Sequence, residues 1–113
     1  MTSLVLIADR HKLDFKLIDF LPQLPKEFSS LEKTIKTFPL DFITLWAIDF
    51  EYSDALPFKY HWQSFRTVEK PFIEDRSNIG WTYKTPGRYL IGIKFLDVFG
   101  GDSIKTIDVL VKA

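Results

Sequence analysis

The sequence contains no cysteine, and this absence removes several kinds of chemistry at once. A disulfide framework, a thiolate nucleophile and a cysteine-rich zinc site all need that side chain. Histidine is scarce as well, because His11 and His61 are the two in the chain and neither has a second ligand at a metal-binding spacing. We therefore expect no catalytic residue, no metal ligand and no cofactor, and we predict that both histidines are surface or half-buried residues.

The chain also lacks a net charge and a long hydrophobic run. Lys plus Arg equals Asp plus Glu at 15 each, so no overall field attracts a phosphate backbone or an anionic membrane. The longest apolar run near the N-terminus covers residues 4–8 and is too short for a signal-peptide core or a membrane span. Nucleic acid is therefore a disfavoured partner, and we expect no membrane segment and a cytoplasmic location.

What the chain has in abundance is apolar and aromatic side chains. Hydrophobic residues make up 46% of the sequence and aromatic residues 16%, with eleven Phe, which is too apolar for a disordered chain. A length of 113 residues is enough for one core but not for two. We predict one folded domain over residues 41–113, preceded by an N-terminal extension over residues 1–40.

The extension gives mixed signals. Apolar positions between residues 4 and 20 fit neither the helical nor the strand period, so the structure of this segment stays open. Ser29 and Glu32 have the spacing of a capping box, and Leu31, Ile35 and Phe38 follow on one side of a helix. We predict a short helix here, ended by Pro39.

From Asp41 the period changes to two, which is typical of a strand. Trp46, Ile48, Phe50 and Tyr52 share one face, and the residues between them share the other. Residues 53–57 contain turn-forming Asp and Pro, and residues 59–67 return to an extended pattern with His61 and Phe65 on one face. The two runs predict a first hairpin, followed by a longer connection over residues 69–80 that could include a short edge strand.

The last part of the chain predicts a second hairpin. A Gly-Gly-Asp turn at residues 100–102 separates two alternating runs. The residues expected to face the core are Tyr89, Ile91, Ile93, Phe95, Ile107, Val109 and Val111. Several short strands with only one short helix indicate a mainly β fold, an antiparallel β-sandwich of immunoglobulin-like type.

Residues 81–111 resemble the C-terminal half of PKD-type domains. The shared features are an aromatic residue, the Pro86-Gly87 turn, Tyr89, an alternating strand and then Asp97 and Gly100 in that order. The resemblance implies that Asp97, at the strand end, caps the loop before the last hairpin. An earlier PKD segment, Trp-Asp-Phe-Gly-Asp-Gly, is matched here by residues 46–52 without its glycines. This departure affects the calcium or sugar roles of some PKD domains, not the fold.

A second resemblance covers residues 41–111. It is carried by Trp46-Ala-Ile-Asp-Phe, Trp62-Gln-Ser-Phe-Arg66-Thr, Pro86-Gly-Arg-Tyr and Val98-Phe-Gly-Gly-Asp102. These segments look like a C-terminal module appended to some restriction-modification DNA methyltransferases and associated helicase subunits. The resemblance implies an accessory module that lacks the methyltransferase catalytic motifs.

Three acidic residues could converge at one end of a sandwich. Asp49, Asp97 and Asp102 could hold calcium together with backbone carbonyls, but their spacing matches no calcium loop. We therefore predict that they cap turns. The glycine pair at residues 100–101 precedes a strand and not a helix, so it lacks the geometry of a phosphate-binding loop.

Tryptophan and arginine supply the candidate binding residues. Trp46 is expected in the core, whereas Trp62, Arg66 and Trp81 are candidates for recognition, since exposed indole rings stack on sugars and bases. Two hypotheses stay open. The first is a module for binding another protein or for assembling a complex, with a homo-oligomer included. The alternative is a module for DNA or carbohydrate, and a joined stripe of cations would favour DNA: Arg66, Lys70, Arg76, Lys84 and Arg88.

Overall fold

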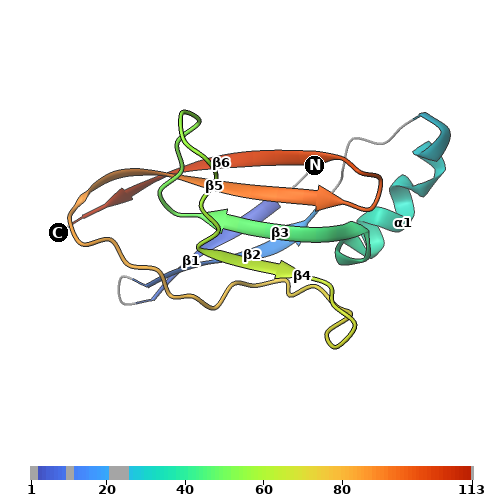
Figure 1. Cartoon of the computed structure of the whole chain (residues 1–113), viewed down its shortest axis with the longest axis horizontal. Helices are drawn as coiled ribbons and strands as arrows, with labels where there is room; N and C mark the ends of the chain where they lie inside the picture. Colours follow the sequence, from blue (N-terminus) through green and yellow to red (C-terminus); the bar gives the residue numbers. More distant parts are fainter. Residues whose placement is uncertain (1–2, 10–11, 21–25, 113) are drawn as a thin grey trace.

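Two antiparallel β-sheets form the molecule, with a short helical segment at one end (Figure 1). The structure is a computed structural model that describes residues 3–9, 12–20 and 26–112. In chain order the elements are β1 (Ser3–Asp9), β2 (Lys12–Asp19), the 3-10 helix η1 (Lys26–Leu31), α1 (Glu32–Thr37), the 3-10 helix η2 (Pro39–Phe42), β3 (Ile43–Asp49), β4 (Trp62–Phe65), β5 (Gly87–Asp97) and β6 (Asp102–Val111). The prediction of a mainly β sandwich is confirmed at this level.

The larger sheet has the strand order β4-β3-β5-β6 and contains both predicted hairpins. β5 and β6 pair from Gly87 opposite Val111 to Leu96 opposite Asp102. The alternating side chains point inward as predicted: Ile91, Ile93, Phe95 and Val109 are buried, and Ile107 and Val111 pack against them. Tyr89 is half-buried at the end of the row.

The first hairpin forms with a longer connection than predicted. β3 pairs with β4 from Leu45 opposite Phe65 to Ile48 opposite Trp62, and residues 50–61 connect the two strands. Trp46 and Ile48 are fully buried on the inner face. The placement of Tyr52 on that same face was wrong, because β3 ends at Asp49 and a turn at residues 50–51 carries Tyr52 over the outer side of Gly92.

The second sheet consists of β1 and β2, and the irregular residues 75–81 lie along its edge with two isolated bridges to β2. β1 and β2 form an antiparallel hairpin, and β2 buries Leu13, Phe15 and Leu17. On the other edge of β2, main-chain hydrogen bonds join Leu13 to Trp81 in both directions, at 2.8 and 3.0 Å, and the Ser77 N–H donates to Phe15 at 2.9 Å. The edge strand considered for residues 69–80 does not form, because this segment meets β2 only through isolated bridges and single main-chain hydrogen bonds.

The hydrophobic core lies between the two sheets and draws on both sides of residue 41. Phe15 and Phe20, from the predicted extension, pack in the same buried cluster as Trp46 and Phe95, and the Phe20 and Phe95 ring centroids are 5.3 Å apart. The predicted boundary at residue 41 therefore separates two segments that share one core.

The predicted helix is present as α1, preceded by the 3-10 helix η1. Ile35 is fully buried, but Phe38 is exposed, so the predicted apolar side is narrower than expected. The capping box was wrong: the N-cap position is Leu31, and no side-chain hydrogen bond caps the helix. Within the described part of the chain, no helix is both long enough and apolar enough to cross a membrane.

Candidate functional site

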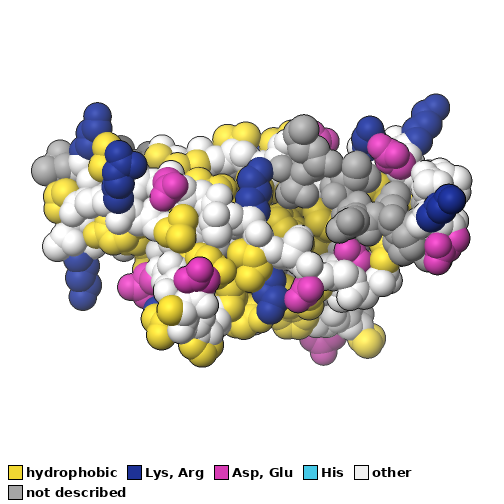
Figure 2. All heavy atoms as spheres, turned by 90° about the horizontal axis from the view of Figure 1, so that it is seen from above, with side chains coloured by type: hydrophobic (Ala, Val, Ile, Leu, Met, Phe, Trp, Pro, Cys, Tyr) yellow, Lys and Arg dark blue, Asp and Glu magenta, His cyan; other side chains and the backbone are white. Residues whose placement is uncertain are grey.

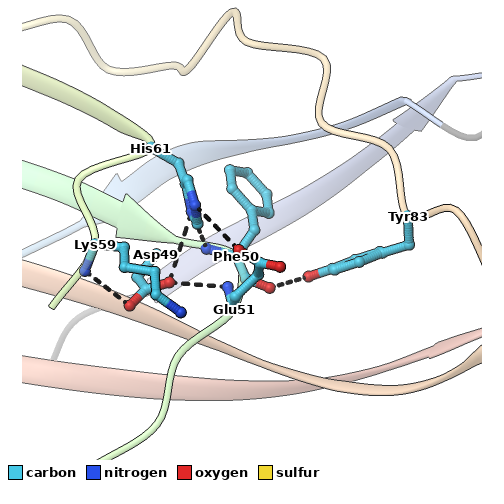
Figure 3. A network of polar contacts seen from close by, with 6 residues as sticks. All are labelled: Asp49, Phe50, Glu51, Lys59, His61 and Tyr83. Carbon is cyan, nitrogen blue, oxygen red and sulfur yellow. Dashed lines mark hydrogen bonds and ion pairs between the residues drawn. The ribbon is translucent and has the colours of Figure 1, made fainter. Parts of the chain in front are cut away.

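The most concentrated polar cluster lies where β3 leaves the sheet, and Asp49 is its centre (Figure 3). Only 1% of Asp49 is exposed, yet both carboxylate oxygens are satisfied. Oδ1 accepts the Glu51 N–H at 2.8 Å, and Oδ2 accepts the Lys59 N–H at 3.0 Å. Because these bonds join the two ends of residues 49–59, Asp49 acts as a turn cap, as predicted.

His61 takes part in the same cluster. Its Nδ1 accepts the Phe50 N–H at 3.0 Å, so in the neutral ring the proton is on Nε2, which lies 3.4 Å from Glu51 Oε1. The Nδ1 lone pair is thus engaged by main chain, although Asp49 Oδ1 is only 3.6 Å away. A general base needs a free lone pair to accept a proton, and the Nδ1 lone pair is already used. The His61 side chain therefore stabilises the loop between β3 and β4.

Tyr83 closes the cluster from the far side of the loop. Its hydroxyl donates to the carbonyl of Phe50, and its ring stacks on Tyr89 with centroids 3.7 Å apart. Burial raises the pKa of the Tyr83 hydroxyl far above its ordinary range, and the negative charge of Glu51 raises it further. Tyr83 is therefore a hydrogen-bond donor and not a ready source of protons.

Asp97 caps the loop that joins β5 and β6, inside the last hairpin. Its Oδ1 accepts the N–H of Phe99 at 2.8 Å and of Gly101 at 3.0 Å. Asp49 and Asp97 thus cap different loops, and Asp102 is exposed. Over residues 3–9, 12–20 and 26–112, no group of three His, Asp or Glu side chains is arranged to hold a metal ion.

The three tryptophans all contribute to packing. Trp46 is fully buried, as predicted, and its indole N–H donates to Glu74 O at 2.7 Å. Trp62 packs edge-on against Trp46 at 4.7 Å and donates to Asn78 Oδ1 at 3.1 Å. Trp81 stacks on Phe50 at 5.1 Å, and its buried Nε1 has no hydrogen-bond partner. Trp62 and Trp81 are each half-buried and packed against the core cluster.

The Arg66 guanidinium makes hydrogen bonds within the chain. The group donates to three main-chain carbonyls: Leu40 at 2.6 Å, Pro71 at 2.8 Å and Ile43 at 3.3 Å. Of the other cations proposed for a basic stripe, Lys70 pairs with Glu74. Figure 2 shows Lys and Arg side chains scattered among acidic and hydrophobic ones on the face drawn there.

An apolar surface crosses the outer side of the larger sheet, and we call it the outer-face patch. Its members lie on neighbouring strands, since Leu45 is directly opposite both Phe65 and Leu96. Phe65 is 45% exposed and Ile104 is 45% exposed, while Leu45 and Leu96 are half-buried. The patch consists of Leu45, Tyr60, Phe65, Leu96 and Ile104.

Residues 52–60 fold back over the sheet beside this patch. Tyr52 lies against Gly92, and Phe58 packs between Tyr52 and Tyr60 at 6.2 and 4.9 Å. The Lys94 Nζ lies over the rings of Phe58 and Tyr60 and donates to the Tyr60 hydroxyl at 3.0 Å. This aromatic flap holds Tyr60 in place, although 47% of that residue is exposed.

A second apolar feature is a cleft of about 530 Å³ at the end of the sandwich opposite α1, which we call the edge cleft. β1 contributes Leu6 and Ala8, β2 contributes Leu13, and β6 contributes Val109, Leu110 and Val111. Residues 83–86 and Lys112 complete its described lining.

The sequence prediction placed recognition on Trp62, Arg66 and Trp81, whereas the outer-face patch includes their neighbours Tyr60 and Phe65. It did not single out Leu45, Leu96 or Ile104. The usable signal was alternation, which puts Leu45 on the opposite face from Trp46.

Comparison of the chain with protein-family models, curated proteins and solved structures finds no match.

Proposed function

We propose that this chain is a non-catalytic module that binds another protein through the outer-face patch. The observation that supports this most directly is the apolar row of Phe65, Leu45 and Leu96, in register across β4, β3 and β5 on the side of the sheet away from the core. Ile104 of β6 lies beside this row, directly opposite Lys94. Exposed apolar side chains scattered singly are normal, but a contiguous set marks an interaction surface.

The composition of the patch suits a protein partner. Tyr60 and Phe65 are aromatic anchors, and aromatic residues are enriched at the centres of protein interfaces. Lys94 is the charged side chain beside them, and its Nζ already bonds Tyr60, so the partner would contribute an apolar surface with a carboxylate near that ammonium. The anchors are held by the sheet and the flap, so little entropy is lost on binding.

The scaffold we propose is an immunoglobulin-like sandwich of PKD type. Support comes from the arrangement of β6-β5-β3-β4 against β1, β2 and residues 75–81, and from the capped loop at Asp97. The proposed setting, based on sequence resemblance alone, is an accessory role beside a restriction-modification DNA methyltransferase in the cytoplasm.

The alternative, recognition of DNA or carbohydrate by Trp62, Arg66 and Trp81, has less support. Trp62 and Trp81 pack against core aromatics, and Arg66 is occupied by three main-chain carbonyls. A ligand for these groups would have to replace internal contacts.

Site-specific photo-crosslinking in the native cell tests the proposal. A photoreactive phenylalanine analogue at Phe65 should capture a defined protein, which mass spectrometry identifies, whereas the same analogue at Thr82, an exposed residue outside the patch, should not. With the purified partner, Ile104→Asp should weaken binding by at least about tenfold. Capture of a second copy of the chain would identify a homo-oligomer, and capture of a methyltransferase subunit would support the proposed setting.

The matched control is Thr106→Asp, a similar change at an exposed position on the same strand. It should leave binding within about twofold of the unmodified chain. Equal crosslinking from both analogue positions, or equal losses from the two aspartate variants, would contradict the proposal.

A further inference from the structure

The edge cleft is a second feature, independent of the outer-face patch. Its volume of about 530 Å³ falls within the range of small-molecule sites, roughly 300 to 1,000 Å³. Most of its walls are aliphatic, from Leu6, Ala8, Leu13, Val109 and Val111. It lies on the opposite side of the larger sheet from the patch, because Val109 and Val111 point inward from β6.

The cleft exists because the two sheets are not joined on this side. Among the described residues, β1 pairs only with β2, and β6 pairs only with β5. Residues 75–81 close the other side of the sandwich, where Trp62 and Ser64 of β4 bond Asn78 and Glu74. An apolar space of about 530 Å³ is therefore left between the β1 and β6 edges.

The charges at the cleft have one sign. Lys84 and Lys112 are the charged residues of its described lining, in a chain whose total charge is zero. Both lysines are exposed, so their ammonium groups stay hydrated at the rim while the cleft walls remain apolar. The Tyr83 hydroxyl is engaged by Phe50 O, so the lysines are the polar groups best placed to select a ligand.

We infer that the edge cleft binds a long-chain alkyl carboxylate, with the alkyl chain between β1 and β6 and the carboxylate at Lys84 and Lys112. Burial of the alkyl chain supplies affinity, at a free energy roughly proportional to the apolar area removed from water. The lysines supply the preference for an anion, since opposite charges attract more strongly beside a low-dielectric wall.

The inference is tested by an isothermal calorimetric titration with dodecanoate, at concentrations below those at which dodecanoate forms micelles. We expect saturable one-to-one binding and at least about tenfold weaker binding of dodecyltrimethylammonium. Ala8→Trp should fill the cleft and abolish dodecanoate binding, with the fold checked by circular dichroism. If that variant does not fold, Val111→Trp serves the same purpose.

Charge reversal separates binding in the cleft from adsorption elsewhere. The double variant Lys84→Glu with Lys112→Glu should reverse the preference between the two amphiphiles. Lys26→Glu with Lys33→Glu changes the total charge equally at exposed positions at the helical end and should not. No binding of dodecanoate, binding unaffected by the cleft-filling variants, or binding only of a short apolar peptide with a free carboxylate would each overturn the inference. Phe65→Asp should leave dodecanoate binding intact, so failure here and failure of the patch are distinguishable.

Discussion

Gly92 illustrates how one missing side chain shapes the outer face. It lies on the side of β5 away from the core and is covered by the ring of Tyr52. A Cβ at this position would be 2.5 Å from Tyr52 Cδ1 and 2.6 Å from Cγ. Contacts this short cannot exist, so any side chain at residue 92 must displace the aromatic flap.

We therefore predict that Gly92→Ala lowers the free energy of unfolding by about 1 to 3 kcal/mol, the usual cost of overpacking. Urea denaturation monitored by tryptophan fluorescence measures the loss. Tyr52→Ala provides the matched background, because removal of the ring makes room for the methyl group. In a double-mutant cycle the alanine at residue 92 should then cost much less. An equal cost with and without Tyr52 would show that the ring does not limit the space.

Gly87 has a different requirement, a backbone conformation that other residues rarely adopt. Its φ is 156°, in the positive region that glycine tolerates. We predict that Gly87→Val costs about 1 to 3 kcal/mol in backbone strain. The melting temperature should fall accordingly, whereas Arg88→Val, one residue further along β5 at an exposed position, should change it little. An unchanged melting temperature for Gly87→Val would refute the strain argument.

At the scale of elements, Arg66 joins three parts of the molecule through main-chain carbonyls. Its guanidinium bonds the carbonyls of η2, the start of β3 and the connection after β4. The planar guanidinium reaches three acceptors at once, which an ammonium cannot reproduce.

We predict that Arg66→Lys destabilises the fold by about 1 to 3 kcal/mol, since hydrogen bonds from a charged donor are lost and carbonyls are left unsatisfied. Thermal unfolding followed by circular dichroism measures it. Gln63→Ala, at an exposed position of β4, the strand that ends just before Arg66, should have an effect within about 0.5 kcal/mol. If instead the two variants unfold alike and Arg66→Lys weakens binding to a nucleic acid, the recognition hypothesis for Arg66 would gain support over the structural one.

Tyr83 gives the fold an expected dependence on alkaline pH. Because burial raises the pKa of its hydroxyl in the folded protein, the unfolded chain releases this proton first, near its ordinary pKa of about 10. The contribution of the protonated Tyr83 hydroxyl to the free energy of unfolding is complete below that pH. It is lost as the pH rises above it.

The stability of the unmodified chain should therefore fall between about pH 9 and pH 11, and part of this fall should disappear in Tyr83→Phe. The phenylalanine keeps the ring that stacks on Tyr89 but has no proton to lose. Guanidinium denaturation at several pH values gives both curves. Parallel curves would show that Tyr83 does not titrate differently in the two states.

The hairpin that the sequence predicted best is the one formed by β5 and β6. In the β5-β6 hairpin, alternation and a Gly-Gly turn specify the same pairing, so Ile91, Ile93 and Val109 were placed correctly. The alternation of Leu13, Phe15 and Leu17 is equally clean. The strand period of β2 was missed in the sequence because β1 lies directly before it. The two strands were considered as one segment, in which no single period fits.

The candidate surfaces were harder to predict. Alternation assigned Leu45 and Trp46 to opposite faces, but it cannot say which face another segment covers. Trp62 and Arg66 have the composition of a recognition surface, yet their partners, Asn78 and the Leu40 carbonyl, are far away in sequence. Such non-local contacts leave no periodic signal in a single chain.

At the scale of the whole molecule, the two sheets depend on each other for a core. Residues 41–113 alone would expose Trp46, Ile48 and Phe95, which now face Leu13, Phe15 and Leu17. We predict that this fragment shows no cooperative unfolding transition by calorimetry. Addition of a peptide of residues 1–40 should restore one. A fragment that melts cooperatively by itself would show that the N-terminal hairpin is dispensable.

The pairing of β2 with residues 75–81 has a consequence for synthesis on the ribosome. The Ser77 hydroxyl bonds the Phe15 N–H and the Asp14 carboxylate across more than sixty residues of sequence. The N-terminal hairpin thus leaves the exit tunnel long before its partners are made, with Phe15 and Leu17 still uncovered. A nascent chain in this condition is a substrate for chaperones, and its folding rate is limited by closure of that long loop.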